Sequence, residues 1–422
     1  MSDGAPSDTS SAASDQSPAK VAPAGETTSW VRRALITAAV VGLGLSVSLP
    51  TLAIILALVF MIFMHELGHY VTARAAGMKV TEFFIGFGPR LWSFRRGETE
   101  YGVKAIPAGA YVRIIGMSNM EEVDPGDEAR TYRQKPYWRR MSVALAGSAM
   151  HFLMAILLFF TVVSVIGTPD PTSSRWSVGA VSQDSAAEAA GLQVGDRILA
   201  VDGIRYDRFQ DLSGYLKANP GKPVDLLVQR GERQLTLSST LGTNQSDGRT
   251  VGFLGVGAEF PSQRVDPLRG AVESVQATGE TIWLSVKGIG QVFSPDGLST
   301  YVQNLAGNAP EAAPGEVEDE GRIISVVGAV QIASRSANVA AALYFLFAIN
   351  VFIGVFNLTP LLPFDGGHAA IATYERIRSR RGQRYFADVS KLMPLTYAVV
   401  AVLALVFVSS LYLDIVDPVS LQ

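Results

Sequence analysis

The chain has 422 residues, of which 48% are apolar and only 17% are charged, a low charged share for a soluble protein. A formal net charge of −3, without any block of basic residues, argues against a nucleic-acid partner. The absence of cysteine excludes disulfide bonds, and it also excludes a thiolate as nucleophile or metal ligand.

The N-terminal residues 1–29 are rich in Ser, Ala, Pro and Asp and show no apolar periodicity. This composition predicts a disordered tail. We do not expect a cleaved signal peptide, because the first apolar run starts late and exceeds the roughly 7–15 apolar residues of a signal core.

Four segments without Asp, Glu, Lys or Arg are each longer than the roughly 20 residues that cross the apolar core of a bilayer. They are Ala34–Met64, Met141–Gly167, Ser336–Phe364 and Leu392–Leu413. Buried helices of globular proteins average about 11–12 residues, so core helices are the weaker alternative. The sequence therefore predicts an α-helical multi-pass membrane protein. Pro50, in the middle of the first run, leaves open one tilted or broken crossing or a short hairpin.

Basic loops predict how these segments are oriented, because Lys and Arg concentrate in short cytoplasmic loops. Residues 76–140 end in a basic cluster and residues 365–391 contain six basic side chains, so both should be cytoplasmic. The transmembrane segments are then residues 30–75, 141–167, 336–364 and 392–413. Residues 168–335 should lie outside the cytoplasm, with the protein in the inner (plasma) membrane.

The motif HELGH ends the first apolar run. On a helix, residues four apart share a face, so His65 and His69 can bind one Zn²⁺. Glu66 is then placed to accept a proton from the attacking water. Catalytic zinc usually has three protein ligands, so a further ligand must come from elsewhere in the chain.

Asp365 is the candidate for the third ligand. It is the only acidic residue between Ser336 and Tyr374, and an acid within a membrane segment is costly and functional by default. Pro360 and Pro363 break the helix beside it, and broken backbone at membrane depth is tolerated only inside protein or along a wet cavity. The two glycines after Asp365 let the chain turn closely against a neighbour.

The region predicted outside the cytoplasm contains the stretch AGLQVGDRILAVDG, with a strand over Arg197–Val201 and a turn after it. This stretch resembles a bacterial PDZ domain, expected over residues 175–259, and a generic small β domain is the alternative. PDZ domains bind an extended peptide or protein tail by strand addition. Residues 260–335 should hold an amphipathic helix at Pro267–Val292, on the membrane surface or on the PDZ domain, and then a mobile linker at residues 307–321.

Together these motifs resemble the site-2 proteases, a family of zinc-dependent intramembrane proteases, and they are closest to actinobacterial members. HELGH resembles the zinc motif of the family, NLTPLLPFDGG its motif with an aspartate ligand, and Gly86–Met117 its membrane-associated β-hairpin. The resemblance implies that His65, His69 and Asp365 bind zinc near the cytoplasmic face, with Glu66 as general base.

The resemblance also implies a substrate. It points to an endopeptidase that cleaves the transmembrane segment of a single-pass membrane protein, of the anti-sigma factor type and already trimmed outside. Asn357 is similar to the family asparagine that helps to bind substrate or the oxyanion.

The PDZ domain would exclude untrimmed substrates, which we favour, or recruit substrate. The alternative from another class is a non-catalytic membrane scaffold that binds tails through its PDZ domain, and an intact HELGH with Asp365 argues against it.

Two stretches depart from the family pattern without touching a metal ligand. Gly147–His151 reads GSAMH where many members have Gly-Pro-x-x-Asn, and Ile106–Tyr111 reads IPAGAY where Pro-x-Gly-Gly and an aromatic residue are commoner. His151 lies inside a predicted span, where an ionisable side chain needs a polar partner. It could bond to the backbone or a neighbouring span, hold substrate or oxyanion, or act as a fourth zinc ligand.

Overall fold

The computed structural model describes residues 46–117, 120–246, 249–305, 338–379 and 383–416, with isolated positions at 38, 42, 328 and 330. The chain divides into two compact units, residues 1–46 and 47–422, and the fold below is that of the second unit. The tail predicted at residues 1–29 and the linker predicted at residues 307–321 lie outside the described residues.

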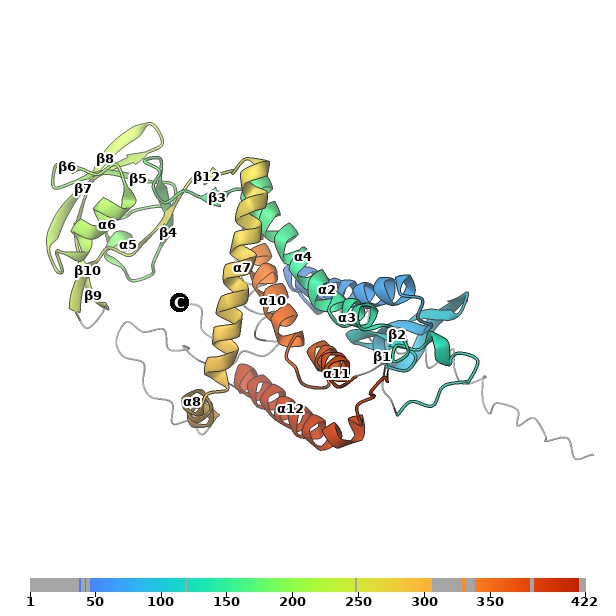
Figure 1. Ribbon diagram of the computed structural model, residues 1–422. Helices are drawn as coiled ribbons and strands as arrows, with labels where there is room; N and C mark the ends of the chain where they lie inside the picture. Colours follow the sequence, from blue (N-terminus) through green and yellow to red (C-terminus); the bar gives the residue numbers. More distant parts are fainter. Residues whose placement is uncertain are drawn as a thin grey trace, which may run out of the picture. The chain divides into compact units, whose positions relative to one another are not determined.

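Within the described residues, four helices are long and apolar enough to cross a membrane. They are α2 (Leu49–Ala75), α4 (Ala146–Phe160) with its continuation η2 (Thr161–Ile166), α10 (Val339–Asn357), and α12 (Met393–Val416) with the short η3 (Val389–Leu392) before it. Helix α4 packs against both α2 and α10 (Figure 1). Glycines permit this close packing, since a Cβ on Gly68 of α2 would lie 2.8 Å from the carbonyl oxygen of Ala146.

The first of these helices has its proline in the first turn and not in its middle. Ser48 is its N-cap and accepts a hydrogen bond from the backbone N–H of Thr51 at 3.3 Å. Pro50 stands in the first turn, where its missing N–H would have no partner in any case. Whether the first apolar run crosses once or twice therefore depends on residues before 46, most of which are outside the described part.

The second span starts later than the sequence predicts. Residues 141–144 belong to a separate helix, α3 (Tyr137–Ala144), and α4 follows at Ala146. Leu145 joins the two helices, and its N–H bonds to the carbonyl oxygen of Met141 at 3.0 Å. The basic end of the preceding loop is therefore part of a short helix.

The region after the third span also differs from the prediction. Residues 365–391 were expected to form a loop, but they begin with helix α11 (Asp365–Arg378). Helix α10 ends at Asn357, because Pro360 and Pro363 cannot donate the backbone hydrogen bonds that would continue it. Asp365 is consequently the first residue of α11 and not part of the third span.

Strands β1 (Val80–Arg96) and β2 (Thr99–Ile114) form the predicted hairpin, but each strand folds over on itself. Phe84 pairs with Tyr111 on one side and with Gly102 on the other. The result is a sheet whose neighbouring segments run in the order 90–96, 99–106, 80–87 and 110–114.

Glycine makes the fold-over in β1 possible. Gly86 has a φ of +87°, a conformation that costs other residues free energy. A Cβ there would also lie only 2.7 Å from the carbonyl oxygen of Ile106. The chain leaves the sheet through η1 (Glu128–Arg130) and reaches α3.

A small β domain follows the second span. Its elements in chain order are β3 (Thr168–Pro169), β4 (Ser177–Val181), α5 (Ala186–Ala189), β5 (Arg197–Val201), β6 (Ile204–Arg205), α6 (Phe209–Lys217), β7 (Pro223–Arg230), β8 (Arg233–Thr240), β9 (Gly242–Ser246), β10 (Arg249–Phe253), β11 (Val256–Glu259) and β12 (Ser262–Gln263). Its main sheet has the order β6-β5-β7-β8. Its core includes Trp176, Ile198 and Leu226, so this region buries a hydrophobic core of its own.

Helix α7 (Pro267–Val292) connects the β domain to α8 (Pro295–Leu305). The sequence left open whether it lies on a membrane surface or on the β domain. In the structure α7 packs along α4 and α10, beside which it runs in Figure 1. Its small buried residues Gly270, Ser274 and Thr278 recur at intervals of four, the spacing of one helix face.

Candidate metal centre

Two histidines and one aspartate from distant parts of the chain converge at the C-terminal half of α2. His65 and His69 lie one turn apart on the same face, and both are buried. Their Nε2 atoms are 3.2 Å apart. The Oδ2 atom of Asp365 lies 3.3 Å from Nε2 of His65 and 3.1 Å from Nε2 of His69. The structure thus brings together the three residues nominated from the sequence.

The spacing of these three atoms fits a tetrahedral zinc ion. Bonds of about 2.0–2.1 Å at tetrahedral angles place neighbouring ligand atoms roughly 3.3 Å apart. The separations of 3.1–3.3 Å among His65, His69 and Asp365 match that value. In the described ranges this is the only group of three or more His, Cys, Asp or Glu residues close enough to hold a metal.

A backbone carbonyl orients His69. Its Nδ1 donates a hydrogen bond to the carbonyl oxygen of Val143 on α3 at 2.8 Å. Nε2 is therefore left without a proton and free to bind a metal, and the ring cannot turn without breaking the bond. Val143 is itself fully buried, in a cluster that includes Ala73 of α2 and Val80 of β1. Sequence reasoning missed this contact, because every residue has a backbone carbonyl and the residue type does not show which one accepts a hydrogen bond.

The two glycines after Asp365 let α11 begin tightly against the preceding chain, as predicted. A Cβ on Gly366 would lie 2.2 Å from the carbonyl oxygen of Leu358, and one on Gly367 would lie 2.6 Å from the backbone nitrogen of Leu362. Any larger residue would push α11 away from this turn. The carboxylate of Asp365 would then move away from the histidines.

The backbone of α4 also touches the histidines. A Cβ on Gly147 would lie 2.3 Å from Cε1 of His65 and 2.5 Å from Nε2 of His69. These contacts are far inside van der Waals distance, so the site requires glycine at position 147.

Comparison with known proteins identifies the family. The profile of Peptidase family M50 matches residues 53–402. The chain belongs to peptidase family M50. This confirms the resemblance to the site-2 proteases and makes the protein a zinc metalloprotease, so the non-catalytic scaffold is not supported.

Its relatives include actinobacterial proteins, as the sequence motifs predict. The zinc metalloprotease Rip1 of Mycolicibacterium smegmatis is 33% identical over 404 residues, which cover 87% of this chain and 97% of the relative. Rip1 of Mycobacterium tuberculosis H37Rv is 33% identical over 402 residues, with the same coverage. The metalloprotease MmpA of Caulobacter vibrioides is 31% identical over 369 residues, 80% of this chain and 89% of MmpA.

One solved structure is similar to a part of the chain. It is the PDZ domain of an SdrC-like protein from Listeria monocytogenes, with 21% identity and a TM-score of 0.19. It covers 21% of this chain and 92% of the solved chain. The PDZ assignment of residues 175–259 stays a prediction from their sequence.

His151 of this M50 peptidase joins two of the long apolar helices, α4 and α10. Its Nδ1 donates to Oδ1 of Asn350 on α10 at 2.9 Å, and Nδ2 of Asn350 donates to the carbonyl oxygen of Leu346 at 2.9 Å. The ring of His151 also lies 5.0 Å from that of His65, between centroids. Of its three candidate roles, these contacts favour the bond to a neighbouring span. Sequence reasoning missed Asn350, although Asn350 and Asn357 are the only amide side chains in the apolar sequence of α10.

Asn357 and Glu66 are not among the three grouped ligand candidates. Asn357 is the last residue of α10, eight positions before Asp365 in the sequence, and it is half-buried. Glu66 is half-buried beside His65 on α2.

We expect Gly147→Ala to lower the zinc content of the M50 peptidase, because the added methyl group must displace the His65 and His69 rings. Zinc per chain in the purified protein, measured by mass spectrometry, checks this. Gly288→Ala on α7 is the control, since a Cβ there meets nothing within 4 Å. Full zinc content in Gly147→Ala would show that the rings tolerate the methyl group.

Exchanges of His151 should separate its roles. His151→Leu leaves the buried Oδ1 of Asn350 without its donor, a loss of about 1–3 kcal/mol in stability, and we expect lower activity with zinc still bound. His151→Asn restores an amide donor and should retain zinc and most activity. Thermal unfolding, zinc content and cleavage rate would be measured for both variants. A fall in zinc content in His151→Asn would point to a ligand role.

Proposed function

We propose that this M50 peptidase is an intramembrane endopeptidase that cleaves transmembrane segments of single-pass membrane proteins. The observation that carries the proposal is the convergence of His65, His69 and Asp365 on a helix that is itself apolar enough to span a bilayer. A metal centre built into such a helix is suited to bonds that lie at membrane depth.

His65, His69 and Asp365 would hold the zinc ion, with His69 kept in place by the Val143 carbonyl. Zinc supplies a Lewis acid that polarises the scissile carbonyl and makes water acidic enough to attack at neutral pH. Glu66 accepts the proton of the attacking water and passes it to the leaving amine. Asn357 donates a hydrogen bond from its amide to the developing oxyanion.

The substrate must reach this centre as an extended or unwound segment. In an intact α-helix each carbonyl oxygen accepts a hydrogen bond and is covered by its own side chains. The histidines are buried and the Gly147 backbone lies against them, so a whole helix has little room at the metal. A single-pass anti-sigma factor, already trimmed outside, is the substrate class that the sequence resemblance supports.

Substrate trapping tests this function. Membranes from cells with the wild-type chain and with Glu66→Gln would be compared by quantitative proteomics. We expect a single-pass membrane fragment to accumulate in the variant and to disappear with the wild type. Accumulation of soluble proteins alone would contradict an intramembrane substrate.

The orientation of the chain belongs to the same proposal. The metal centre lies near the cytoplasmic face of the plasma membrane, and the β domain lies outside. The basic residues of segments 76–140 and 365–391 support this orientation through the bias of Lys and Arg toward the cytoplasm. Cysteine labelling of an otherwise cysteine-free chain would check it, at position 208 in the β domain against position 384 after α11.

The β domain, read as a PDZ domain, is proposed to exclude untrimmed substrates. Its ends are close together, because β3 pairs with β12 and the N–H of Asp170 donates to the carbonyl oxygen of Pro261 at 3.1 Å. Residues 175–259 can therefore be replaced by a short flexible linker.

For a filter, the deletion variant should cleave the untrimmed substrate that the wild type leaves intact, because all candidate metal ligands lie elsewhere. For a recruiting domain, cleavage of trimmed substrate should fall instead. Gel analysis of both substrate forms distinguishes the two, and unchanged cleavage of both would reject both.

A further inference from the structure

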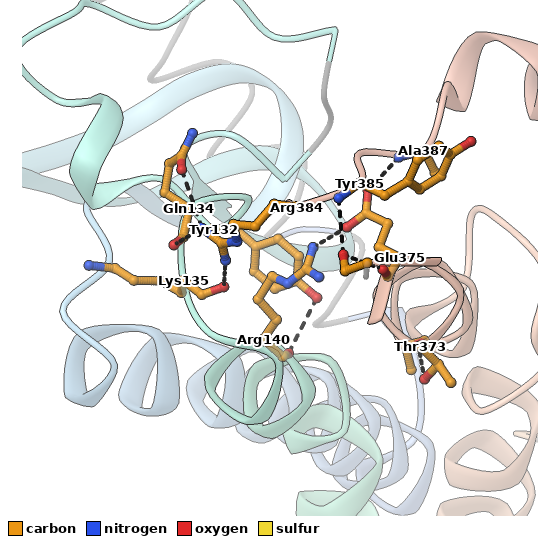
Figure 2. Close-up of polar contacts among 11 residues, drawn as sticks. Tyr132, Gln134, Lys135, Arg140, Thr373, Glu375, Arg384, Tyr385 and Ala387 are labelled. Carbon is orange, nitrogen blue, oxygen red and sulfur yellow. Dashed lines mark hydrogen bonds and ion pairs between the residues drawn. The ribbon is translucent and has the colours of Figure 1, made fainter. Parts of the chain in front are cut away.

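A buried ion pair joins α3 to α11, away from the metal centre. Arg140 on α3 and Glu375 on α11 are only 7% and 2% exposed. Nη1 of Arg140 lies 2.5 Å from Oε2 of Glu375, and the other carboxylate oxygen accepts a hydrogen bond from the backbone N–H of Ala387 at 2.7 Å (Figure 2). Both oxygens of Glu375 are thus engaged, each by a different segment.

Neighbouring contacts fasten the same two elements. Arg384, which follows α11, donates to the carbonyl oxygens of Gln134 at 2.9 Å and Lys135 at 2.8 Å, just before α3 (Figure 2). The guanidinium of Arg140 lies over the ring of Tyr132, 5.8 Å from its centroid. The segments flanking α3 and α11 are therefore tied together beside the ion pair.

The two joined helices are those that set the positions of His69 and Asp365. Helix α3 carries the Val143 carbonyl that holds His69, three residues after Arg140. Helix α11 begins with Asp365 and carries Glu375 further along. A change in the spacing of these helices would change the distance between Nε2 of His69 and Oδ2 of Asp365, now 3.1 Å.

Burial of this pair is costly in a way that stability alone does not explain. Removing two charges from water costs several kcal/mol each, and well-packed apolar residues are often at least as stabilising. What a guanidinium and a carboxylate provide is a directional, charge-assisted hydrogen bond, here from Nη1 of Arg140 to Oε2 of Glu375. Arg140 and Glu375 are suited to fixing alignment rather than to adding stability.

We propose that Arg140 and Glu375 are positioning residues that align α3 with α11 and thereby set the zinc affinity of the site. This inference rests on the proposed role of His65, His69 and Asp365 as the ligands. Partners outside the ligand shell typically change metal affinity by about 10–100-fold.

The test replaces both charges at once, because a single neutral substitution would leave a buried charge unpaired. The full chain with Arg140→Met and Glu375→Met would be purified in nanodiscs. Its zinc dissociation constant would be measured by chelator competition, and the unfolding temperature of its zinc-free form by scanning fluorimetry. We expect zinc affinity to fall about tenfold or more, with the zinc-free unfolding temperature close to that of the wild type.

The matched control is another Arg–Glu pair. Arg130 and Glu98 form two hydrogen bonds of 2.6 and 2.5 Å between η1 and the turn before β2, and neither residue is on α3 or α11. Methionine at both positions should leave zinc affinity unchanged. Arg140→Lys keeps the charge but loses the planar guanidinium that bonds to Glu375 and lies over the Tyr132 ring, and it should weaken zinc binding even if the double variant fails to fold.

Unchanged zinc affinity in Arg140→Lys and in the double variant overturns the inference. It is also overturned if the control pair lowers affinity equally, or if only the zinc-free unfolding temperature falls. Failure of the proposed function would give a different result. If the His65→Ala variant still bound zinc as the wild type does, His65 would not be a ligand, and the ligand set on which the inference rests would be wrong.

Discussion

Glu66→Gln should bind zinc as tightly as the wild type and yet cleave its membrane substrate at least about 10²–10⁴-fold more slowly. The side chain follows a proposed ligand on α2 but is not one of the three grouped residues. Glutamine has nearly the same size, so packing is preserved, but its amide cannot accept a proton at neutral pH. Zinc content and cleavage rate of purified protein are the measurements.

Glu280→Gln on the exposed side of α7 is the matched control for this exchange. It removes one carboxylate from another long helix and should change neither zinc content nor rate. Substantial cleavage by purified Glu66→Gln protein would exclude Glu66 as the proton acceptor. Loss of zinc in this variant would make Glu66 a ligand instead.

Asp365→Ala should lose both zinc and cleavage, because it removes one of three ligand atoms from a site that keeps only two imidazoles. We expect about one zinc per wild-type chain and almost none in the variant after dialysis against a weak chelator. The stabilisation that zinc adds to thermal unfolding should also disappear, since only the folded protein with an intact site gains from binding.

Asp365 also lies in the first turn of α11, where a negative charge stabilises the helix by about 0.3–1 kcal/mol. Asp211→Ala is therefore the matched control, because Asp211 occupies the first turn of α6 in the β domain. It carries the same helix-end penalty without touching the metal centre. Full zinc content in Asp365→Ala would show that another group supplies the third ligand.

The candidate site residues could be predicted because each motif lies within one short stretch of the sequence. His65 and His69 share a face on any helix, and a lone acid beside two prolines and two glycines stands out in an apolar run. The lengths of the four apolar runs likewise predicted helices that reach across a bilayer. These features depend on the spacing of residues within a single segment. The period of a helix fixes which of these residues share a face, whatever the helix packs against.

The local sequence pattern was less informative where the structure depends on how two segments pair or pack. The β1–β2 region was predicted as a hairpin, but pairing of each strand with two neighbours decides its folded-over form. Helix α7 is amphipathic, and that pattern indicates a buried face without identifying the surface that covers it. Its packing on α4 and α10 is a property of the assembled helices.

The sequence by itself determined the candidate metal ligands, the long apolar segments and the peptidase family of this protein. Only the tertiary structure decided how the ligands are held. Along the sequence, Val143 is 74 residues and Asp365 is 296 residues from His69. Glu375 is 235 residues from Arg140. Contacts of this kind form only when the helices pack together. They involve backbone features, such as the carbonyl oxygen of Val143 and the space beside Gly147. Side-chain type along the chain therefore says little about them, although they set the geometry on which zinc binding depends.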